Sequence, residues 1–264
     1  MRCLRFLPVL LGCVLSFWIS SCAPKAGTEP PVYLATISNE GPNLKVRYDL
    51  PQSQSELLLT DYDKQQRASA WKVRDNGFEF DGQKLIRTDG ALFDYVTFDL
   101  VRDPKFFNRR YVVVDEIGPE SWSLYLTAFR VQNQETEIKF QSNDRLMTRI
   151  GAETHDMGET YRLSDKSVMS YFGRAKFIKD DKAIIIAGPD IPTWLIEDVG
   201  AGVSQTMSVL EKSFEVPPVN RPTLYLTTVS SENDGSSKGG QLSDAVMTFR
   251  YRGVDFSKDN KELR

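Results

Sequence analysis

Cysteine and histidine are both scarce in this sequence. The 264 residues include 3 cysteines and 1 histidine. A zinc site takes three or four protein ligands, mostly from these two residue types, and a disulfide framework needs paired cysteines. The scarcity therefore argues against a multi-histidine zinc site, a cysteine cluster and a disulfide-stapled fold.

A surplus of positive charge is also missing. Lys and Arg number 33 against 36 for Asp and Glu, which gives a formal net charge of -3 at pH 7. Binding to nucleic acid phosphates needs a basic surplus on one face, so we expect no nucleic acid partner. Hydrophobic residues make up 41% of the chain, which is enough for a sizeable core in one or two domains.

The first 22 residues combine positive charge, an apolar run and a cysteine. Arg2 and Arg5 precede the run Phe6–Ile19, which is too short for a comfortable bilayer span and leads into Ile19-Ser20-Ser21-Cys22. This order resembles a bacterial lipoprotein signal. The resemblance implies cleavage before Cys22 and a diacylglyceryl anchor on its thiol, with fatty acyl chains such as palmitate. An ordinary secretory signal and a buried helix with a chance cysteine are the alternatives.

Processing would divide this region into a signal peptide, residues 1–21, and a small, polar, proline-containing tether, residues 22–31. Cys3 and Cys13 would leave with the signal, so no cysteine except the acylated Cys22 would remain. Ala23 stands where an aspartate would, by resemblance to diderm lipoproteins, favour retention at the inner membrane. We therefore expect a cell-envelope protein that contacts the membrane through its lipid anchor, located at the outer membrane and facing the periplasm.

Residues 32–182 consist of short apolar runs separated by turn residues. Runs such as Val32–Ile37 and Tyr95–Leu100 show mostly period-two patterning, and turn signals such as Asp75-Asn76-Gly77 lie between them. Strands at this spacing predict an antiparallel β-sandwich.

The pattern changes near Ala183. A strand-like run, 183–187, is followed by apolar residues at three- and four-residue steps, which predict a helix of about six turns from Pro192 to Phe214. A strand at Thr223–Val229, a polar loop at Ser230–Gly240 and a strand at Leu242–Tyr251 follow. We predict an α+β fold, with the sandwich at 32–182 and a partial mixed α/β domain at 183–264. The helix residues expected to be buried against the sheet are Trp194, Leu195, Val203, Met207 and Leu210.

Candidate catalytic groups are few. His155 lies among three carboxylates in Gly151–Glu159, but its H-x-x-x-E spacing does not match the H-E-x-x-H zinc motif, and a lone histidine in an acidic loop is usually solvated. The pairs Asp180-Asp181 and Asp61-x-Asp63 lack calcium-loop spacing. No G-x-S-x-G elbow accompanies the histidine, and Gly235–Gly240 lacks the phosphate-loop pattern. The sequence thus offers no catalytic or metal-binding residue.

One resemblance covers residues from about 183 to 253. Three segments carry it: Pro192-Thr193-Trp194-Leu195 at the helix start, Arg221–Leu226 as the next strand, and Gly239-Gly240-Gln241-Leu242 before the following strand. Together they resemble the opening of a gluzincin-type aminopeptidase catalytic domain, especially the glycyl-aminopeptidase-like branch, whose members also carry a β-sandwich before that domain. The resemblance implies that Gly239, Gly240 and Gln241 line a substrate cleft in which a peptide is held by strand addition.

The sequence lacks the residues that carry out catalysis in that family. The family's H-E-x-x-H helix and later glutamate ligand are not found before Arg264, and Ala245–Phe249 has no glutamate for a substrate amine. Asp255–Arg264 reads as the entry to a helix, so either it is a frayed terminal turn or the chain is the N-terminal part of a longer protein. We expect the second. We expect residues 1–264 to be catalytically inert as they stand. Zinc would be needed only if the protein continues beyond Arg264, and whether the whole protein is an enzyme stays open.

Two functions therefore remain open. The first is an envelope-anchored lipoprotein corresponding to the N-terminal portion of a zinc aminopeptidase, with a peptide or protein ligand. The second is a periplasm-facing lipoprotein whose β-sandwich has a binding or structural role without enzymatic activity.

Overall fold

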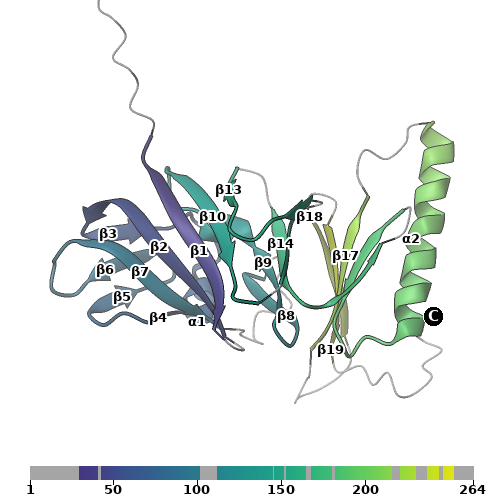
Figure 1. Cartoon of the computed structure of the whole chain (residues 1–264), viewed down its shortest axis with the longest axis horizontal. Helices are drawn as coiled ribbons and strands as arrows, with labels where there is room; N and C mark the ends of the chain where they lie inside the picture. Colours follow the sequence, from purple (N-terminus) through teal and green to yellow (C-terminus); the bar gives the residue numbers. More distant parts are fainter. Residues whose placement is uncertain are drawn as a thin grey trace, which may run out of the picture. The chain divides into compact units, whose positions relative to one another are not determined.

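The computed structural model describes residues 30–252, except for 41–42, 102–111, 145, 152, 165–167, 180–181, 216–220, 230–236 and 244–245. It confirms the α+β fold with a β-rich N-terminal part (Figure 1). Cys22, the predicted signal peptide and nearly all of the tether lie outside the described residues, as do Asp180 and Asp181.

The first sheet has six strands in the order β13-β10-β1-β2-β7-β4. Neighbouring strands pair antiparallel, with one exception: β1 runs parallel to β10, with Val32 opposite Glu135 and Ser38 opposite Gln141. The sheet is therefore mixed, whereas the sequence predicted a purely antiparallel sandwich. Its strands are β1 (Val32–Glu40), β2 (Asn43–Gln54), β4 (Trp71–Val73), β7 (Phe93–Leu100), β10 (Glu135–Gln141) and β13 (Thr160–Arg162).

Two further sheets complete the N-terminal part. A five-stranded sheet has the order β12-β11-β14-β9-β8, and a three-stranded sheet has the order β3-β6-β5. The five strands are β8 (Val114–Gly118), β9 (Ser121–Tyr125), β11 (Met147–Ile150), β12 (Glu153–His155) and β14 (Met169–Gly173). The remaining elements are β3 (Glu56–Leu58), β5 (Phe78–Phe80), β6 (Lys84–Arg87), the helix α1 (Lys64–Ala70) and the 3-10 turn η2 (Leu126–Phe129).

Period-two patterning places one face of each long strand in a common core. In β1, Tyr33, Ala35 and Ile37 are buried while the alternate residues face outward. The rings of Phe140, from the six-stranded sheet, and Phe172, from the five-stranded sheet, lie 5.3 Å apart between centroids. The two sheets therefore pack face to face, as the sequence predicted.

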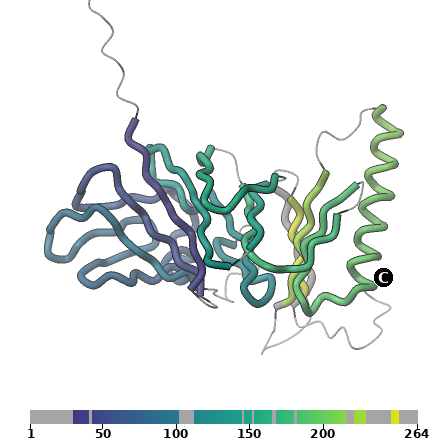
Figure 2. The backbone as a smooth tube through the Cα atoms, viewed as in Figure 1, coloured from purple at the N-terminus to yellow at the C-terminus, as the bar shows by residue number. Residues whose placement is uncertain are grey.

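The C-terminal region forms a fourth sheet, which is mixed and has the order β15-β16-β17-β19-β18. Its three central strands are parallel, and β15 and β18 pair antiparallel at the two edges. The helix α2 (Thr193–Phe214) connects β16 to β17 and lies along one face of this sheet (Figures 1 and 2). The strands are β15 (Lys176–Lys179), β16 (Ile184–Ala187), β17 (Thr223–Val229), β18 (Ser237–Ser243) and β19 (Val246–Arg252).

The predicted loop to Gly240 and single strand Leu242–Tyr251 are wrong. The structure has a hairpin instead, in which Ser243 of β18 pairs with Val246 of β19. The sequence after β18 continues with Asp244, and serine and aspartate are residue types that favour turns. Apolar residues lie both before and after Ser243 and Asp244, so the sequence pattern predicted one strand where the structure has two.

The prediction for the helix is correct in its extent and partly wrong in its burial. Leu195 is buried and Trp194, Val203 and Met207 are partly buried, but Leu210 is 43% exposed. The helix has 22 residues, which corresponds to about 33 Å of length. The strands beneath it have 4 to 7 residues, or about 13–23 Å. The C-terminal half of α2 therefore extends beyond the sheet.

The opposite face of this sheet joins the core of the N-terminal part. Ile184, Ile186 and Tyr225 belong to the same buried cluster as the two packed sheets. The backbone approaches closely at this junction: a Cβ atom on Gly188 would lie 2.2 Å from the carbonyl oxygen of Ile117. Only glycine fits at that position.

Candidate functional site

The three residues predicted to line a substrate cleft lie together on one strand. Gly239, Gly240 and Gln241 belong to β18 and pair with Arg250, Phe249 and Thr248 of β19. Because β18 is the last strand in the order of its sheet, its outer edge pairs with no strand of the described part of the chain. Such an edge offers backbone N–H and C=O groups to an extended peptide.

His155 is in a strand, where the sequence suggested an acidic loop. It belongs to β12 and pairs with Thr148. Its Nε2 lies 3.9 Å from Glu153 Oε2, and its ring meets the ring of Tyr161 edge to face at 5.5 Å between centroids. Within the described ranges, no group of three or more His, Cys, Asp or Glu side chains is arranged to hold a metal ion.

Asp63 of the Asp61-x-Asp63 pair is the N-cap residue of α1. Its carboxylate caps α1 by accepting a hydrogen bond from the backbone nitrogen of Gln66 at 3.1 Å. An N-cap of this kind stabilises a helix by about 1 kcal/mol. The Asp63 carboxylate therefore serves the start of α1.

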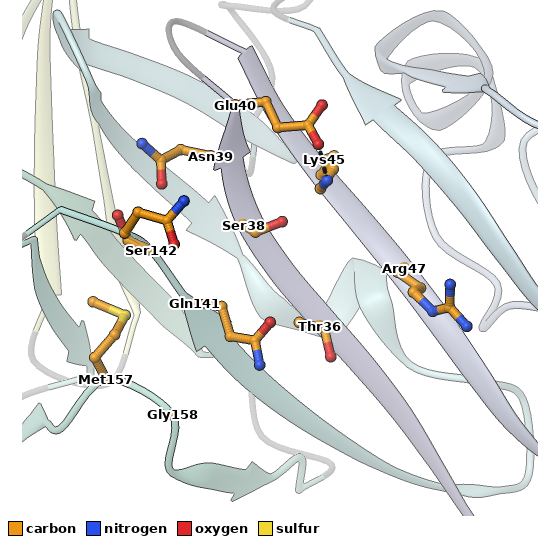
Figure 3. Close-up of a pocket in the computed structure, with 11 residues that line it drawn as sticks. Thr36, Ser38, Asn39, Glu40, Lys45, Arg47, Gln141, Ser142, Met157 and Gly158 are labelled. Carbon is orange, nitrogen blue, oxygen red and sulfur yellow. Dashed lines mark hydrogen bonds and ion pairs between the residues drawn. The ribbon is translucent and has the colours of Figure 1, made fainter.

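A hollow lies on the outward face of the six-stranded sheet (Figure 3). Thr36 and Ser38 of β1 lie opposite Arg47 and Lys45 of β2, and Ser38 also lies opposite Gln141 of β10. Because side chains alternate along a strand, the residues between them face the core and these face outward. We call this hollow the β1 groove; its volume is about 580 Å³ and its lining residues are Thr36, Ser38, Asn39, Glu40, Lys45, Arg47, Gln141, Ser142, Asn143, Met157 and Gly158.

The turn after β12 forms one wall of the β1 groove. The backbone nitrogen of Gly158 donates a hydrogen bond to the Phe140 carbonyl at 2.9 Å, which ties the turn to β10. Gly158 has a φ of +91°, a left-handed conformation that favours glycine. Met157 is partly buried, and its sulfur accepts a hydrogen bond from Thr148 Oγ1 at 3.9 Å. This wall is therefore held in place by both backbone and side chains.

The charged residues of the β1 groove are held in ion pairs. Glu40 accepts hydrogen bonds from Lys45 and from Arg74, the latter at 2.7 Å, and these bonds lower the pKa of Glu40. Arg47 Nε donates to Asp49 Oδ1 at 2.8 Å, which raises the pKa of Arg47. These pairs neutralise the charges at the side of the groove formed by β2, and hydroxyl and amide groups make up most of the remaining lining.

The β1 groove was not predicted from the sequence. The period-two pattern indicated that Thr36, Ser38, Lys45 and Arg47 face outward, but many strands have polar outward faces. The hollow depends on β10 lying beside β1 and on the turn at Met157, and both relationships join distant parts of the chain. Local patterning carries no signal for such a pairing.

Comparisons with known proteins give no family for this chain. No protein-family model matches the sequence, and a search of curated proteins finds no significant relative. Among the described residues, no helix has the length and hydrophobicity needed to span a bilayer.

Proposed function

We propose that this protein is a lipid-anchored envelope lipoprotein that corresponds to the N-terminal portion of a gluzincin-type aminopeptidase and binds an extended peptide along β18. The observation that carries the proposal is the order of the C-terminal sheet: three parallel strands followed by an antiparallel edge strand that contains Gly239, Gly240 and Gln241. The peptide would add to this edge as a further strand.

The proposed role for these residues is binding rather than catalysis. With a single histidine in residues 1–264, the chain given lacks the H-E-x-x-H pair that holds zinc and activates water in such enzymes. Zinc and hydrolysis would require residues beyond those given. Within the chain itself, β18 supplies backbone hydrogen-bonding groups, which bind peptides with little dependence on their sequence.

Backbone methylation of the peptide tests this proposal. The full chain would be purified in detergent and titrated with fluorescent hexapeptides in which single backbone nitrogens are methylated in turn. In an added antiparallel or parallel strand, alternate N–H groups point toward the partner strand. We expect methylation at every second position to abolish binding and methylation at the intervening positions to leave it unchanged.

Those intervening positions serve as the matched control, since the modified peptides have the same mass and composition. Failure of every unmodified hexapeptide to bind would contradict the proposal. Binding that is equally sensitive, or equally insensitive, to methylation at all positions would show that the peptide does not pair with a strand edge.

The second candidate function is a binding lipoprotein whose ligand site lies in the β-sandwich part. The β1 groove favours it, because this is a polar hollow with a wall fixed by Gly158 and Met157. This candidate needs neither the β18 edge nor a peptidase activity.

A further inference from the structure

The lining of the β1 groove combines hydrogen-bond donors and acceptors without an excess of either charge. Hydroxyl and amide groups both donate and accept hydrogen bonds. The carboxylates that pair with Lys45 and Arg47 come from Glu40 and Asp49, within the same two strands. The neutral polar side chains of the groove are Thr36, Ser38, Asn39, Gln141, Ser142 and Asn143.

One of these groups lacks a partner in the described part of the chain. The side-chain oxygen of Asn39 is buried and accepts no hydrogen bond there. Buried polar atoms are normally hydrogen-bonded, so this oxygen is available as an acceptor for a donor that enters the groove. The groove thus has unused hydrogen-bonding capacity close to its other amide and hydroxyl groups.

Apolar surface is present at two places beside these polar groups. Met157 lines one wall. Beyond the opposite wall, the residue Tyr95 in β7 is 43% exposed, and the centroid of its ring lies 4.1 Å from the guanidinium carbon of Arg47. A sugar ring presents hydroxyl groups at its edge and C–H groups on its faces, so it needs both kinds of surface.

We propose that the β1 groove binds a neutral oligosaccharide. The hydroxyl and amide groups bond to the sugar hydroxyls, and Met157 contacts the C–H face of a ring, with Tyr95 available to a further unit of the chain. An anionic ligand is disfavoured because it would have to displace Glu40 from Lys45 or Asp49 from Arg47. A protein ligand is disfavoured because hot spots of protein interfaces are buried aromatic and arginine anchors, whereas this lining is mostly small and polar.

A binding assay with defined sugars tests this inference independently of the β18 edge. The full chain, in a detergent without a sugar head group, would be titrated by calorimetry with hexasaccharides of glucose and of N-acetylglucosamine, with an acidic oligogalacturonate and with the hexapeptides described above. We expect at least one neutral hexasaccharide to bind and the acidic sugar not to bind.

Variants locate the site. Gln141→Ala removes an exposed amide from the groove and is expected to weaken binding by about tenfold, equivalent to roughly 1.4 kcal/mol. Ser38→Trp fills the groove from the solvent face of β1 and is expected to abolish binding. Gln52→Ala removes an amide from an exposed position of β2 outside the groove lining, so it serves as the matched control and should bind like the unchanged protein.

Three results would overturn the inference: no neutral hexasaccharide binds, only the acidic sugar or the peptides bind, or binding survives Ser38→Trp in a variant whose circular dichroism spectrum is unchanged. Loss of sugar binding alone, with peptide binding retained, would leave the proposal for β18 intact. Loss of peptide binding alone, with sugar binding retained, would leave the proposal for the β1 groove intact.

Discussion

The side chains of Arg250 and Asp115 form a buried ion pair across the junction between the C-terminal sheet and the N-terminal part. Arg250 Nε in β19 donates a hydrogen bond to Asp115 Oδ2 in β8 at 2.7 Å. The Asp115 residue is 0% exposed and Arg250 is 7% exposed. Close by, Thr227 Oγ1 donates to the backbone oxygen of Glu116 at 3.2 Å. Polar contacts therefore join the apolar contacts in holding the C-terminal sheet against the five-stranded sheet that contains β8.

Removing one member of this pair should destabilise the protein strongly. In Arg250→Met the Asp115 carboxylate stays buried without its ionic partner, which typically costs about 3–5 kcal/mol. Replacing both residues, as in Asp115→Leu with Arg250→Met, should recover most of that loss, because no buried charge is left. Urea unfolding followed by circular dichroism measures both free energies.

The control for this experiment is the exposed pair between Lys64 and Asp81, whose side chains are 50% and 51% exposed. Lys64→Met should cost no more than about 1 kcal/mol, as solvent-exposed pairs usually do. Equal effects of Lys64→Met and Arg250→Met would mean that the Arg250 pair is not buried as described.

The close approach at Gly188 gives a second prediction. An alanine there would place its Cβ atom 2.2 Å from the Ile117 carbonyl oxygen, so the backbone must shift and the protein should lose about 1–3 kcal/mol of stability. Gly202→Ala is the matched control, because a Cβ atom at this α2 position meets nothing within 4 Å. That variant should be neutral or gain up to about 1 kcal/mol from helix propensity. A neutral Gly188→Ala variant in thermal melts would contradict the close approach of Gly188 to Ile117 of β8.

Metal content gives a third prediction. A catalytic zinc normally takes three protein ligands, and His155 contacts Glu153 and Tyr161 rather than converging with two further ligands in the described structure. We expect purified residues 23–264 to contain no stoichiometric zinc by elemental analysis and to hydrolyse no aminoacyl substrate. One zinc per chain that is lost in His155→Ala would overturn this expectation and make His155 a ligand.

Local sequence signals predicted the elements better than their partners. The three- and four-residue apolar steps predicted the helix to Phe214, because a helix is defined by neighbours within one turn. The short helix Lys64–Ala70 was missed, because seven residues give too few turns for a period to be visible. The parallel pairing of β1 with β10 was also missed, because it joins strands that are distant in the sequence.

The candidate sites, too, were predicted only where the signal lies in a local stretch of sequence. Gly239, Gly240 and Gln241 were predicted as cleft residues through a resemblance in sequence, and the pairing with β19 shows that they lie on an edge strand. The β1 groove was not found at all, because its walls come from β1, β2, β10 and the turn at Met157. Leu210 was expected in the core because apolar periodicity indicates which face of a helix is buried. It does not indicate how far along the helix the covering sheet extends.

The proposed location and the proposed membrane attachment both depend on the lipid anchor at Cys22. If Cys22 is the attachment site, Cys22→Ser should release the protein from membranes or leave an unprocessed precursor. A Ser21→Ala variant keeps a small residue before the cysteine and should be processed normally. Fractionation of cells expressing the three forms measures this difference.

Mass spectrometry of the N-terminal peptide of the membrane-bound protein measures the lipidation of Cys22 itself. We expect a mature chain that begins at Cys22 with a thioether-linked diacylglyceryl group on its sulfur. A mature chain that begins at another residue, or an unmodified Cys22 thiol in the membrane fraction, would contradict this expectation.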